Sequence, residues 1–536
     1  MSSTHEVTNQ PPPLEGYDVF GCDAPLVEGV DRTGAAWAVP DLHRLGELAG
    51  SGEAIEWGFQ ANTNPPVLRT HDRYGHRVDE VDYHPAYHEL MRVAVTHGLH
   101  ASPWIDPKRG SHVARVAGFY VWSQVDTGHG CPISMTYSVV PALRANTQVA
   151  AAWEPRLTAR GYDPASRPAG EKVGALAGMA MTEKQGGSDV RANTTRAEPL
   201  GEAYALTGHK WFCSAPMSDL FLMLAQAPGG LSCFAVPRWT PDGSRNAVRL
   251  QRLKDKLGNR SNASSEIELD GAWGMLVGEE GRGVSTIIQM VNHTRLDCVS
   301  GAASTMRQAL AQATHHAAHR EAFGRRLAEQ PLMTNVLGDL AIESEAATLT
   351  MLRLAQAYDS GDDSEAAFRR LATAVAKYWV CKRQPGFVGE ALECLGGNGY
   401  VEESIMPRLF RESPLNGIWE GSGNVMCLDV LRAMAREPQT VDAFRAELAA
   451  AEGADPRFDA YVRSLAWQAD EPGARRLVER LALALQASLV LRWSPPAVAD
   501  AFCASRLDGD AGLAYGTLPS GVDAPAIVER ATPKVA

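Results

Sequence analysis

Residues 179–214 decide the fold. The stretch begins Met179-Ala180-Met181-Thr182-Glu183-Lys184-Gln185-Gly186-Gly187-Ser188-Asp189 and ends Gly208-His209-Lys210-Trp211-Phe212-Cys213-Ser214. Its double glycine lets the backbone approach a ligand closely and adopt a positive φ. The hydroxyl groups of Thr182 and Ser188 can bind anionic oxygens, and Trp211 with Phe212 offers a flat apolar wall. We therefore expect a pocket for a ligand that is flat at one end and phosphorylated at the other; a plain hairpin turn beside a buried tryptophan is the alternative.

Length and composition are those of a multidomain globular protein. The 536 residues are enough for three or four domains of ~150 residues, and 45% of them are hydrophobic. The net charge of −12 gives no overall basic signal for nucleic acid. Residues 1–13 are polar and proline-rich, and no apolar run reaches ~18 residues, so we expect neither a signal segment nor a membrane span.

The nine cysteines are scattered and form no Cys-x-x-Cys pair. Their odd number argues against a disulfide framework. Because reduced cysteines suit a reducing compartment, we expect a cytoplasmic protein.

The apolar period changes twice along the chain. Residues 1–40 look irregular, and helical spacing follows from Asp41 onward. Between about Ala177 and Trp273 the period becomes two, as expected of short strands. These strands are predicted at Leu220–Ala225, Leu231–Val236, Val248–Leu253 and Ser265–Leu269. Long helices are predicted after Gly281-Arg282-Gly283, running past Arg295 towards His319, and at Leu332–Asp359, Glu365–Glu393 and Arg475–Trp493. The pattern predicts a compact antiparallel β domain between helical ones.

His315 and His319 lie one helical turn apart, which is a spacing that metal pairs use. No glutamate completes a His-Glu-x-x-His pattern, and no third ligand suggests itself. We therefore expect hydrogen-bonding or solvated histidines and no metal site.

The opening stretch resembles the flavin-binding motif of the acyl-CoA dehydrogenase superfamily. Members carry Met-Thr-Glu-x-x-x-Gly-Ser-Asp followed by Gly-x-Lys-x-Trp or a near variant, and Met181–Asp189 with Gly208–Trp211 fits this wording. The variant Lys184-Gln185-Gly186 is most similar to the branch of flavoproteins linked to the bacterial adaptive response to DNA alkylation. Two further stretches, Thr8–Pro11 and Asn62–Pro66, also look like that branch.

This resemblance implies an α+β fold of the acyl-CoA dehydrogenase type, with FAD bound between domains and subunits. The expected parts are an N-terminal α-helical domain (1–176), a middle antiparallel β-barrel domain (177–282), a C-terminal helical bundle with flavin and oligomer contacts (283–436), and a helical extension of that branch (437–536). Shared flavin contacts imply at least a homodimer, and the superfamily usually forms homotetramers.

Two more segments resemble superfamily motifs. Arg320-Glu321-Ala322-Phe323-Gly324, followed by Gln330, is similar to the segment whose arginine and phenylalanine reach the flavin of a neighbouring subunit. A guanidinium pairs well with pyrophosphate, although an ordinary surface arginine is the alternative. Leu395-Gly396-Gly397-Asn398-Gly399 matches an element near the adenosine end of the flavin, but Glu393 stands where the family often has glutamine.

The cofactor-binding residues that the resemblance implies come from all these motifs. They are Met179, Met181, Thr182, Gly187, Ser188, Trp211, Phe212, Cys213, Ser214, Arg320, Phe323, Gly396, Gly397, Trp419, Gly421, Ser422, Gly423 and Asn424.

A turn of small residues, Gly421-Ser422-Gly423-Asn424, leads into a helix whose apolar positions are expected at Val425, Leu428, Leu431 and Ala435. Free N–H groups at a helix N-terminus suit a phosphate or a flavin edge. Glu420, just before the turn, could simply complement the helix dipole. The resemblance instead implies that Glu420 is the catalytic base, with Trp419 replacing the more usual tyrosine.

The implied reaction is α,β-dehydrogenation of an acyl thioester. Glu420 would remove the α proton, with fixed donors stabilising the negative charge that develops on the thioester oxygen. Some members place the base beside the arginine of an earlier helix, but Thr294 occupies that position here. Thr182, Ser188 and Arg295 are the candidate substrate contacts. Asn292 stands where the family pattern has an acidic residue. The resemblance therefore does not imply CoA recognition of the standard kind.

The extension 437–536 is where the adaptive-response branch departs from ordinary members, and a role in binding double-stranded DNA is associated with it. Its 10 lysines and arginines against 14 acidic residues give a charge of −4, whereas a DNA groove needs clustered positive charge. Arg475 and Arg476, with Arg432 of the preceding helix, are the candidate DNA contacts. Three hypotheses stay open. The first is a flavoprotein that protects or binds DNA, with at most weak, isovaleryl-CoA-like dehydrogenase activity. The second is a working acyl-CoA dehydrogenase on an unusual or branched thioester, and the third is a non-catalytic flavin-bound scaffold.

Overall fold

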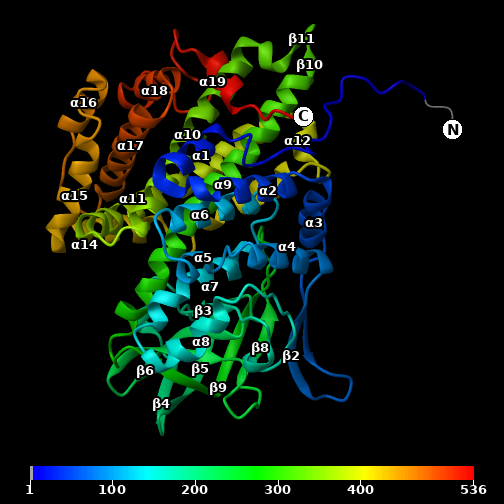
Figure 1. The fold of residues 1–536 in the computed structure, drawn as a ribbon, viewed down its shortest axis with the longest axis vertical. Helices are drawn as coiled ribbons and strands as arrows, with labels where there is room; N and C mark the ends of the chain where they lie inside the picture. Colours follow the sequence, from blue (N-terminus) through cyan, green and yellow to red (C-terminus); the bar gives the residue numbers. More distant parts are fainter. Residues whose placement is uncertain (1–3, 536) are drawn as a thin grey trace. The chain divides into compact units, whose positions relative to one another are not determined.

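A computed structural model describes residues 4–535, which form two compact units (Figure 1). Of the described residues, unit 1 contains 4–55, His112–Gln124 and 298–535. Unit 2 contains Glu56–Ser111 and Val125–Asp297. Among the described residues, no helix is long and apolar enough to cross a membrane.

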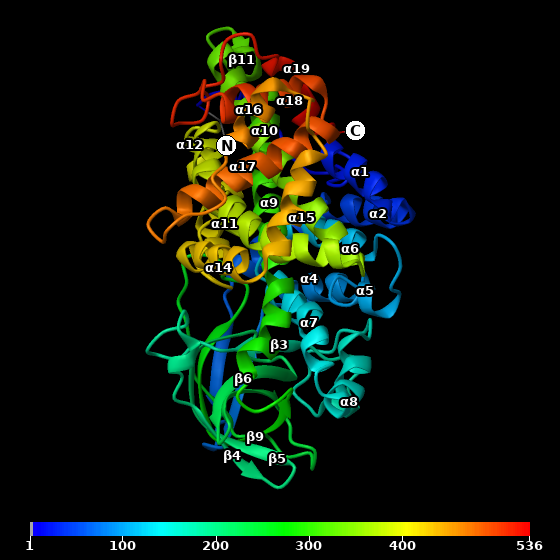
Figure 2. The same cartoon turned by 90° about the vertical axis from the view of Figure 1, so that its left-hand side faces the viewer.

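Unit 2 is built around a seven-stranded sheet. Its strands are β3 (Ala177–Ala180), β4 (Arg196–Leu200), β5 (Ala203–Ser214), β6 (Leu220–Ala227), β7 (Gly230–Pro237), β8 (Val248–Leu253) and β9 (Ser264–Val277). They follow the order β3-β6-β4-β5-β9-β7, and β7 also pairs with β6, so five strands close into a ring, while β8 pairs with β9. Figure 2 shows β4, β5, β6 and β9 of this sheet. The pairings are antiparallel except those that β6 makes with β3 and β4.

The interior of this barrel is apolar. Phe221, Met223, Phe234, Ile267 and other fully buried side chains fill it. Leu220–Ala225 and Val248–Leu253 were predicted as strands from their short β-rich runs, and the structure confirms both. Burial on both faces explains why β6 reads as a continuous apolar run rather than as an alternating one.

Helices and one hairpin complete unit 2. They are the end of α3 (Gly52–Thr63), β1 (Val67–His71), β2 (Arg77–Asp82), α4 (Pro85–Thr96), α5 (Ser102–Ile105), α7 (Gly130–Leu143), α8 (Thr147–Leu157), η3 (Ala169–Glu171) and η4 (Val190–Ala192). The antiparallel hairpin β1–β2 follows Pro65-Pro66 and was not predicted. Its first strand buries no residue, so it carries no clear apolar alternation.

The early part of unit 1 contains short helices. They are α1 (Ala24–Val30), η1 (Asp31–Ala35), η2 (Ala36–Ala38), α2 (Val39–Ala49) and α6 (Ser111–Ser123). The expectation that residues 1–40 are irregular is wrong for Ala24–Val30, which forms a helix with Pro25 in its first turn. Proline fits the first turn because its missing N–H would have no helical partner there.

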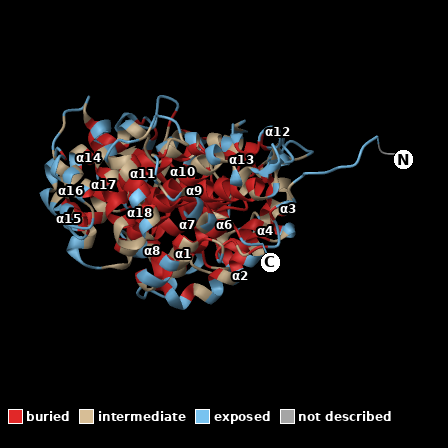
Figure 3. Cartoon of the chain, turned by 90° about the horizontal axis from the view of Figure 1, so that it is seen from above, coloured by how far each residue is buried: buried red, intermediate tan, exposed pale blue. Residues whose placement is uncertain are grey.

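Long helices form the core of unit 1 (Figure 3). They are α9 (Gly283–His319), which begins in unit 2, α10 (Pro331–Asp359) and α11 (Asp363–Glu393). Their bounds agree with the predicted helices within two residues, and most of their residues from Leu337 to Leu354 and from Leu371 to Cys381 are buried. Apolar and small residues recur all around these helices, as expected of segments buried on every side.

Shorter elements follow in unit 1. They are β10 (Glu321–Ala322), β11 (Arg325–Arg326), η5 (Leu327–Glu329), α12 (Gly397–Tyr400), α13 (Met406–Glu412), η6 (Leu415–Gly417), α14 (Gly423–Arg436), α15 (Pro438–Ala449), α16 (Pro456–Arg463), α17 (Ala474–Trp493), α18 (Pro496–Phe502), η7 (Cys503–Leu507) and α19 (Ala524–Ala531).

The apolar face predicted for α14 is wrong. The helix begins at Gly423 as expected, but it buries Met426, Cys427, Val430 and Ala433. Leu428 is 38% exposed. Two apolar stripes lie on this helix, and only contacts with the rest of the bundle decide which one is buried.

Candidate functional site

Glu183 of the flavin motif is a structural carboxylate in unit 2. Its buried side chain accepts hydrogen bonds from the Lys210 ammonium at 2.8 Å and from the hydroxyl groups of Thr194 at 3.0 Å and Thr195 at 2.6 Å. The Lys210 ammonium also donates to the carbonyl oxygen of Leu224 at 2.7 Å. Because Lys210 belongs to β5 and Leu224 to β6, this network ties the small-residue loop to the barrel wall.

Burial alone raises the pKa of the Glu183 carboxyl group. Hydrogen bonds from Lys210, Thr195 and Thr194 outweigh burial and hold this pKa well below its usual range. Glu183 is therefore charged at neutral pH and serves as a fixed acceptor. It is not a catalytic group, although it stands in the most specific motif of the chain.

The predicted ligand-binding hydroxyls lie beside a tightly packed glycine. A β carbon added at Gly187 would lie 2.4 Å from Thr182 Oγ1, so any larger residue would force Thr182 to move. Across residues 4–535, the hydroxyl groups of Thr182 and Ser188 have no hydrogen-bond partner, and Ser188 is exposed. These unused donors fit the polar edge and phosphate oxygens of FAD.

The two rings of the predicted aromatic wall lie in different surroundings. The backbone N–H of Trp211 donates to the carbonyl oxygen of Thr182 at 2.8 Å, so the two halves of the motif are in contact. The Lys254 ammonium lies 3.1 Å from the centre of the Trp211 ring and also 2.7 Å from a Glu266 carboxylate oxygen. One face of the indole is therefore covered by a cation. Phe212 stays 48% exposed and provides the accessible ring.

The neighbouring predicted residues contribute in different ways. Met179 and Cys213 are buried, and burial raises the pKa of the Cys213 thiol to about 12. Cys213 is part of the barrel core, so only its backbone can contact a cofactor. Ser214 shares a hydrogen bond of 3.1 Å with Ser264. Met181 accepts a hydrogen bond from the Asn193 side chain on its carbonyl oxygen, which further fixes the loop.

Arg295 lies on α9 within unit 2 and is buried. Its neighbour Thr294 is also buried and donates its hydroxyl to the carbonyl oxygen of Val291 at 3.0 Å. A threonine held in this way is not a base. The position beside Arg295 therefore offers no alternative to Glu420.

Glu420 lies in unit 1, in the turn that leads into α14. Its φ is 58°, in the left-handed region that side chains other than glycine rarely adopt, and Gly421 follows with φ 105°. The Trp419 indole donates to the Asn416 side-chain oxygen at 2.9 Å, which fixes the residue before Glu420. Backbone strain of this kind concentrates at functional sites.

A comparison of two substitutions at this position measures the strain. We expect Glu420→Gly to be more stable than Glu420→Ala by about 1 kcal/mol, because glycine adopts the left-handed conformation without a steric cost. Both variants lack the carboxylate, so the comparison isolates the backbone. Urea denaturation of the two purified variants gives the difference; equal midpoints would mean that the turn is unstrained.

Residues 422–424 form the N-terminus of α14. Ser422 precedes its first residue without a side-chain cap, and Asn424 accepts a hydrogen bond from the Arg475 guanidinium at 2.8 Å. A β carbon at Gly423 would lie 3.4 Å from the Tyr378 ring. Arg475 of the extension therefore lies at this helix N-terminus, where the helix dipole already favours an anion.

Phe323 lies in the small hairpin β10–β11, and Arg320 directly precedes its first strand. Phe323 and Gly324 form its two-residue turn with φ of 54° and 77°, which is typical of a type I′ turn. Phe323 is 99% exposed. The Arg320 guanidinium donates to the carbonyl oxygen of Asn9, whose side chain pairs with the backbone N–H and carbonyl of Glu321, both at 2.8 Å.

The N-terminal arm, residues 4–13, therefore joins two predicted flavin segments. Beside Asn9, Gln10 accepts a hydrogen bond of 3.2 Å from Asn398 in the glycine-rich element. Gly396 there has φ 59° and ψ −140°, a conformation that only glycine adopts readily. Sequence reasoning missed the role of Asn9 and Gln10, because the only signal was their similarity to one branch of the superfamily.

The two histidines of α9 make hydrogen bonds, as predicted. His315 bonds through Nε2 with the Pro12 carbonyl oxygen at 2.9 Å, and His319 bonds through Nδ1 with the His315 carbonyl oxygen at 2.8 Å. His315 therefore helps to hold the N-terminal arm on α9, whereas the bond of His319 stays within its own helix.

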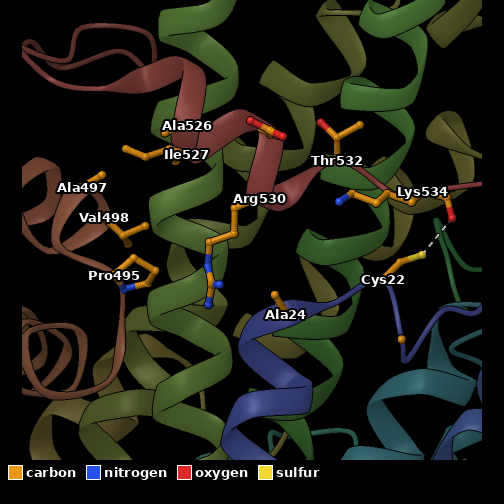
Figure 4. Close-up of a pocket in the computed structure, with 12 residues that line it drawn as sticks. Cys22, Ala24, Pro495, Ala497, Val498, Ala526, Ile527, Arg530, Thr532 and Lys534 are labelled. Atoms are coloured by element: carbon orange, nitrogen blue, oxygen red, sulfur yellow. Dashed lines mark hydrogen bonds between the residues drawn. The ribbon is translucent and has the colours of Figure 1, made fainter.

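A cavity of about 480 Å³ opens elsewhere in unit 1 (Figure 4). Ala24, Val498, Ile527 and Arg530 contribute to its lining, and Cys22 donates from its thiol to the Lys534 carbonyl oxygen at 3.3 Å. None of the predicted flavin, catalytic or DNA residues lines this cavity.

Comparisons with known proteins match three consecutive regions of the chain. Residues 9–164 match the N-terminal domain family of the adaptive response protein AidB. Residues 178–272 match the middle domain of acyl-CoA dehydrogenases, and residues 281–435 match their C-terminal domain.

Individual relatives agree with this division. AidB of Escherichia coli (strain K12) is 46% identical over 520 residues, which cover 95% of this chain and 96% of that protein. Acyl-CoA dehydrogenase family member 11 of Caenorhabditis elegans is 31% identical over 425 residues, covering 75% and 68% of the two chains. The crystal structure of Caenorhabditis elegans ACDH-11 in complex with C11-CoA superposes with a TM-score of 0.85 at 25% identity, over 94% of both chains. The chain belongs to the acyl-CoA dehydrogenase family, and within that family it is close to AidB.

Proposed function

We propose that this protein is an FAD-dependent oxidoreductase that removes one hydrogen from the α carbon and one from the β carbon of an acyl thioester. The observation that carries the proposal is Glu420, a carboxylate held in a strained turn at the start of α14, at the position of the family's aromatic-Glu-Gly segment. Glu183, the glutamate of the flavin motif, is excluded as a base by its buried ion pair with Lys210.

Each unit, taken by itself, has residues that fit a part of FAD. In unit 2, Thr182, Ser188 and the exposed ring of Phe212 offer donors and an apolar surface. In unit 1, the N-terminus of α14 and the Arg320 guanidinium offer positive charge for phosphates. Bound FAD supplies an acceptor for the hydride that leaves the β carbon.

Glu420 performs the proton step. Its carboxylate takes the proton from the α carbon while the thioester oxygen gains negative charge, and it becomes a neutral carboxylic acid. Fixed donors must stabilise that charge, because an α proton of a thioester is otherwise far too weak an acid for a carboxylate. Thr182, Ser188 and Arg295 are the proposed thioester contacts.

Anaerobic titration of the purified flavoprotein with acyl-CoA tests this function. We expect isovaleryl-CoA or an eleven-carbon acyl-CoA, the ligand class of the ACDH-11 complex, to bleach the visible flavin absorbance. A flavin that stays oxidised with short, branched and long acyl-CoAs would contradict the proposal and favour a non-catalytic flavoprotein.

Exposed apolar side chains support a homo-oligomer, which we propose to be a tetramer. Phe323 stands on the turn of its hairpin, and Leu332, Tyr400, Phe410 and Ile418 are also exposed on unit 1. So much exposed apolar area is typical of interaction surfaces. Light scattering combined with size exclusion measures the mass, and a monomer would contradict this proposal.

DNA binding in the alkylation response is a second candidate function. Its support is local: Arg432, Arg475 and Arg476 are exposed on the packed helices α14 and α17. Other arginines of the extension point inward instead, since Arg506 pairs with Asp339 and Arg530 pairs with Glu345. These inward pairs hold the extension on α10 and leave it few cations for a phosphate backbone.

A salt series with duplex DNA separates the two candidates. If the protein contacts phosphates, the logarithm of the binding constant falls linearly with the logarithm of the salt concentration. The slope is about −0.9 for each phosphate contacted. Replacing Arg432, Arg475 and Arg476 together by glutamine would then flatten the slope by up to about 3. No binding at low salt would leave thioester oxidation as the function. The free cysteines of the described chain fit a cytoplasmic location for either function.

A further inference from the structure

Lys377 on α11 is a buried cation that the reaction does not directly use. Its side chain is only 1% exposed. Its ammonium donates to the carbonyl oxygen of Trp419 at 2.7 Å and to the carbonyl oxygen of Gly421. These are the residues immediately before and after Glu420.

A cation in this position is costly to keep. Removing an ammonium group from water costs several kcal/mol unless good partners replace the water. Within residues 4–535, no carboxylate forms an ion pair with Lys377, so neutral carbonyl groups satisfy it. An apolar side chain of similar length would fill the same space without this cost, which indicates that the donors themselves are needed.

The two hydrogen bonds hold the Trp419–Glu420 peptide, which directly precedes Glu420, and the Gly421–Ser422 peptide, which lies one residue beyond it. Glu420 has φ 58° and Gly421 has φ 105°, so the chain reverses direction here with little help from regular secondary structure. Backbone carbonyls that point toward a common donor hold such a turn in one conformation. Lys377, the donor, belongs to the long helix α11. Its hydrogen bonds therefore fix the position of the turn relative to that helix.

We propose that Lys377 is the positioning residue of the catalytic base: it clamps the backbone around Glu420 and so sets where the carboxylate meets the α proton. This inference rests on the proposed function of Glu420. General-base catalysis depends on such placement, since a shift of about 1 Å can cost about 100-fold in rate. Lys377 touches neither substrate nor cofactor in this role.

Proton exchange tests the clamp without the oxidation step. The thioester tert-butylacetyl-CoA has α hydrogens but no β hydrogen, so it cannot be dehydrogenated. In heavy water, Glu420 removes an α proton and returns a deuteron, and mass spectrometry follows the incorporation. We expect Lys377→Met to slow exchange at saturating thioester about 100-fold, with thioester affinity and flavin content within about threefold of wild type.

Matched variants give the test its controls. Lys382→Met makes the same change at an exposed position of the same helix and is expected to exchange like wild type. Lys377→Arg keeps a charged donor and is expected to exchange at least about tenfold faster than Lys377→Gln, a comparison that also decides the matter if the methionine variant fails to fold. Exchange at the wild-type rate in the folded methionine variant, or equal rates for arginine and glutamine, would overturn the clamp.

The same assay separates failure of the clamp from failure of the proposed function. If Glu420→Gln exchanges as fast as wild type, or wild type does not exchange at all, Glu420 is not the base and the clamp has no role to serve. If Glu420→Gln loses exchange while Lys377→Met keeps it, the base is confirmed and only the clamp is wrong.

Discussion

Replacing Glu420 by glutamine is expected to slow thioester-dependent flavin reduction by about 10²–10⁴-fold, the range that a positioned general base contributes. Glutamine keeps the shape of the side chain and the left-handed turn but cannot accept the α proton. Glu183 of the flavin motif is already engaged by Lys210, Thr194 and Thr195. It is therefore not expected to replace Glu420 as the base.

Rapid mixing without oxygen measures this effect at saturating acyl-CoA. Thioester affinity is expected to change little, because the amide fills the same volume. Glu403→Gln is the matched control, since Glu403 is an exposed glutamate of the same connecting region. A Glu420→Gln variant that reduces flavin at the wild-type rate would show that another group removes the proton.

Replacing Lys210 by methionine is expected to destabilise the folded protein by about 3–5 kcal/mol at neutral pH, as breaking a buried ion pair does. Glu183 would stay charged and buried, with the threonine donors alone to satisfy it. The loop that carries Gly187 and Ser188 would lose its attachment to β5. Weaker flavin binding is therefore expected together with the loss of stability.

The effect of pH on this variant has a definite sign. In wild type, the lowered pKa of Glu183 contributes stability that is fully present above the ordinary value of 4.5 and is lost as pH falls below it. Without Lys210 the pKa of Glu183 rises, because burial then meets fewer opposing hydrogen bonds. The difference in free energy of unfolding between wild type and Lys210→Met should therefore be largest at neutral pH and become smaller in acid.

Denaturant unfolding of both proteins at neutral and mildly acidic pH measures this difference. Lys184→Met, at an exposed position of the same loop, is the control and should stay within about 0.5 kcal/mol of wild type. A Lys210→Met deficit below about 1 kcal/mol, or one that grows in acid, would mean that the pair does not hold the loop.

Sequence periodicity was sufficient for the large elements. Long helices such as α9 and α11 and strands such as β6 and β8 were predicted nearly to their ends, because burial imposes a repeating pattern on many residues. The hairpin β1–β2 was missed because its first strand buries no side chain and therefore shows no alternation.

The candidate site was only partly predictable. Motif wording pointed to Glu420 and to the small-residue loop, but it could not assign Glu183 to the scaffold. The contacts of Lys377 with Trp419 and of Asn9 with Arg320 join residues 42 and 311 positions apart. Contacts between residues so far apart in the sequence cannot be predicted from the spacing of residues within a short segment. The buried face of α14 was wrong for a related reason, since packing partners chose between its two apolar stripes.

The measurement that tests the central claim most directly is the mass of the acyl product after a single anaerobic turnover. Enzyme and isovaleryl-CoA are mixed in equal amounts, and the thioester is recovered once the flavin absorbance has stopped changing. We expect one thioester to lose two hydrogen atoms for each flavin that is bleached. Unchanged thioester, with or without bleaching, would contradict the assignment of this protein as an α,β-dehydrogenase.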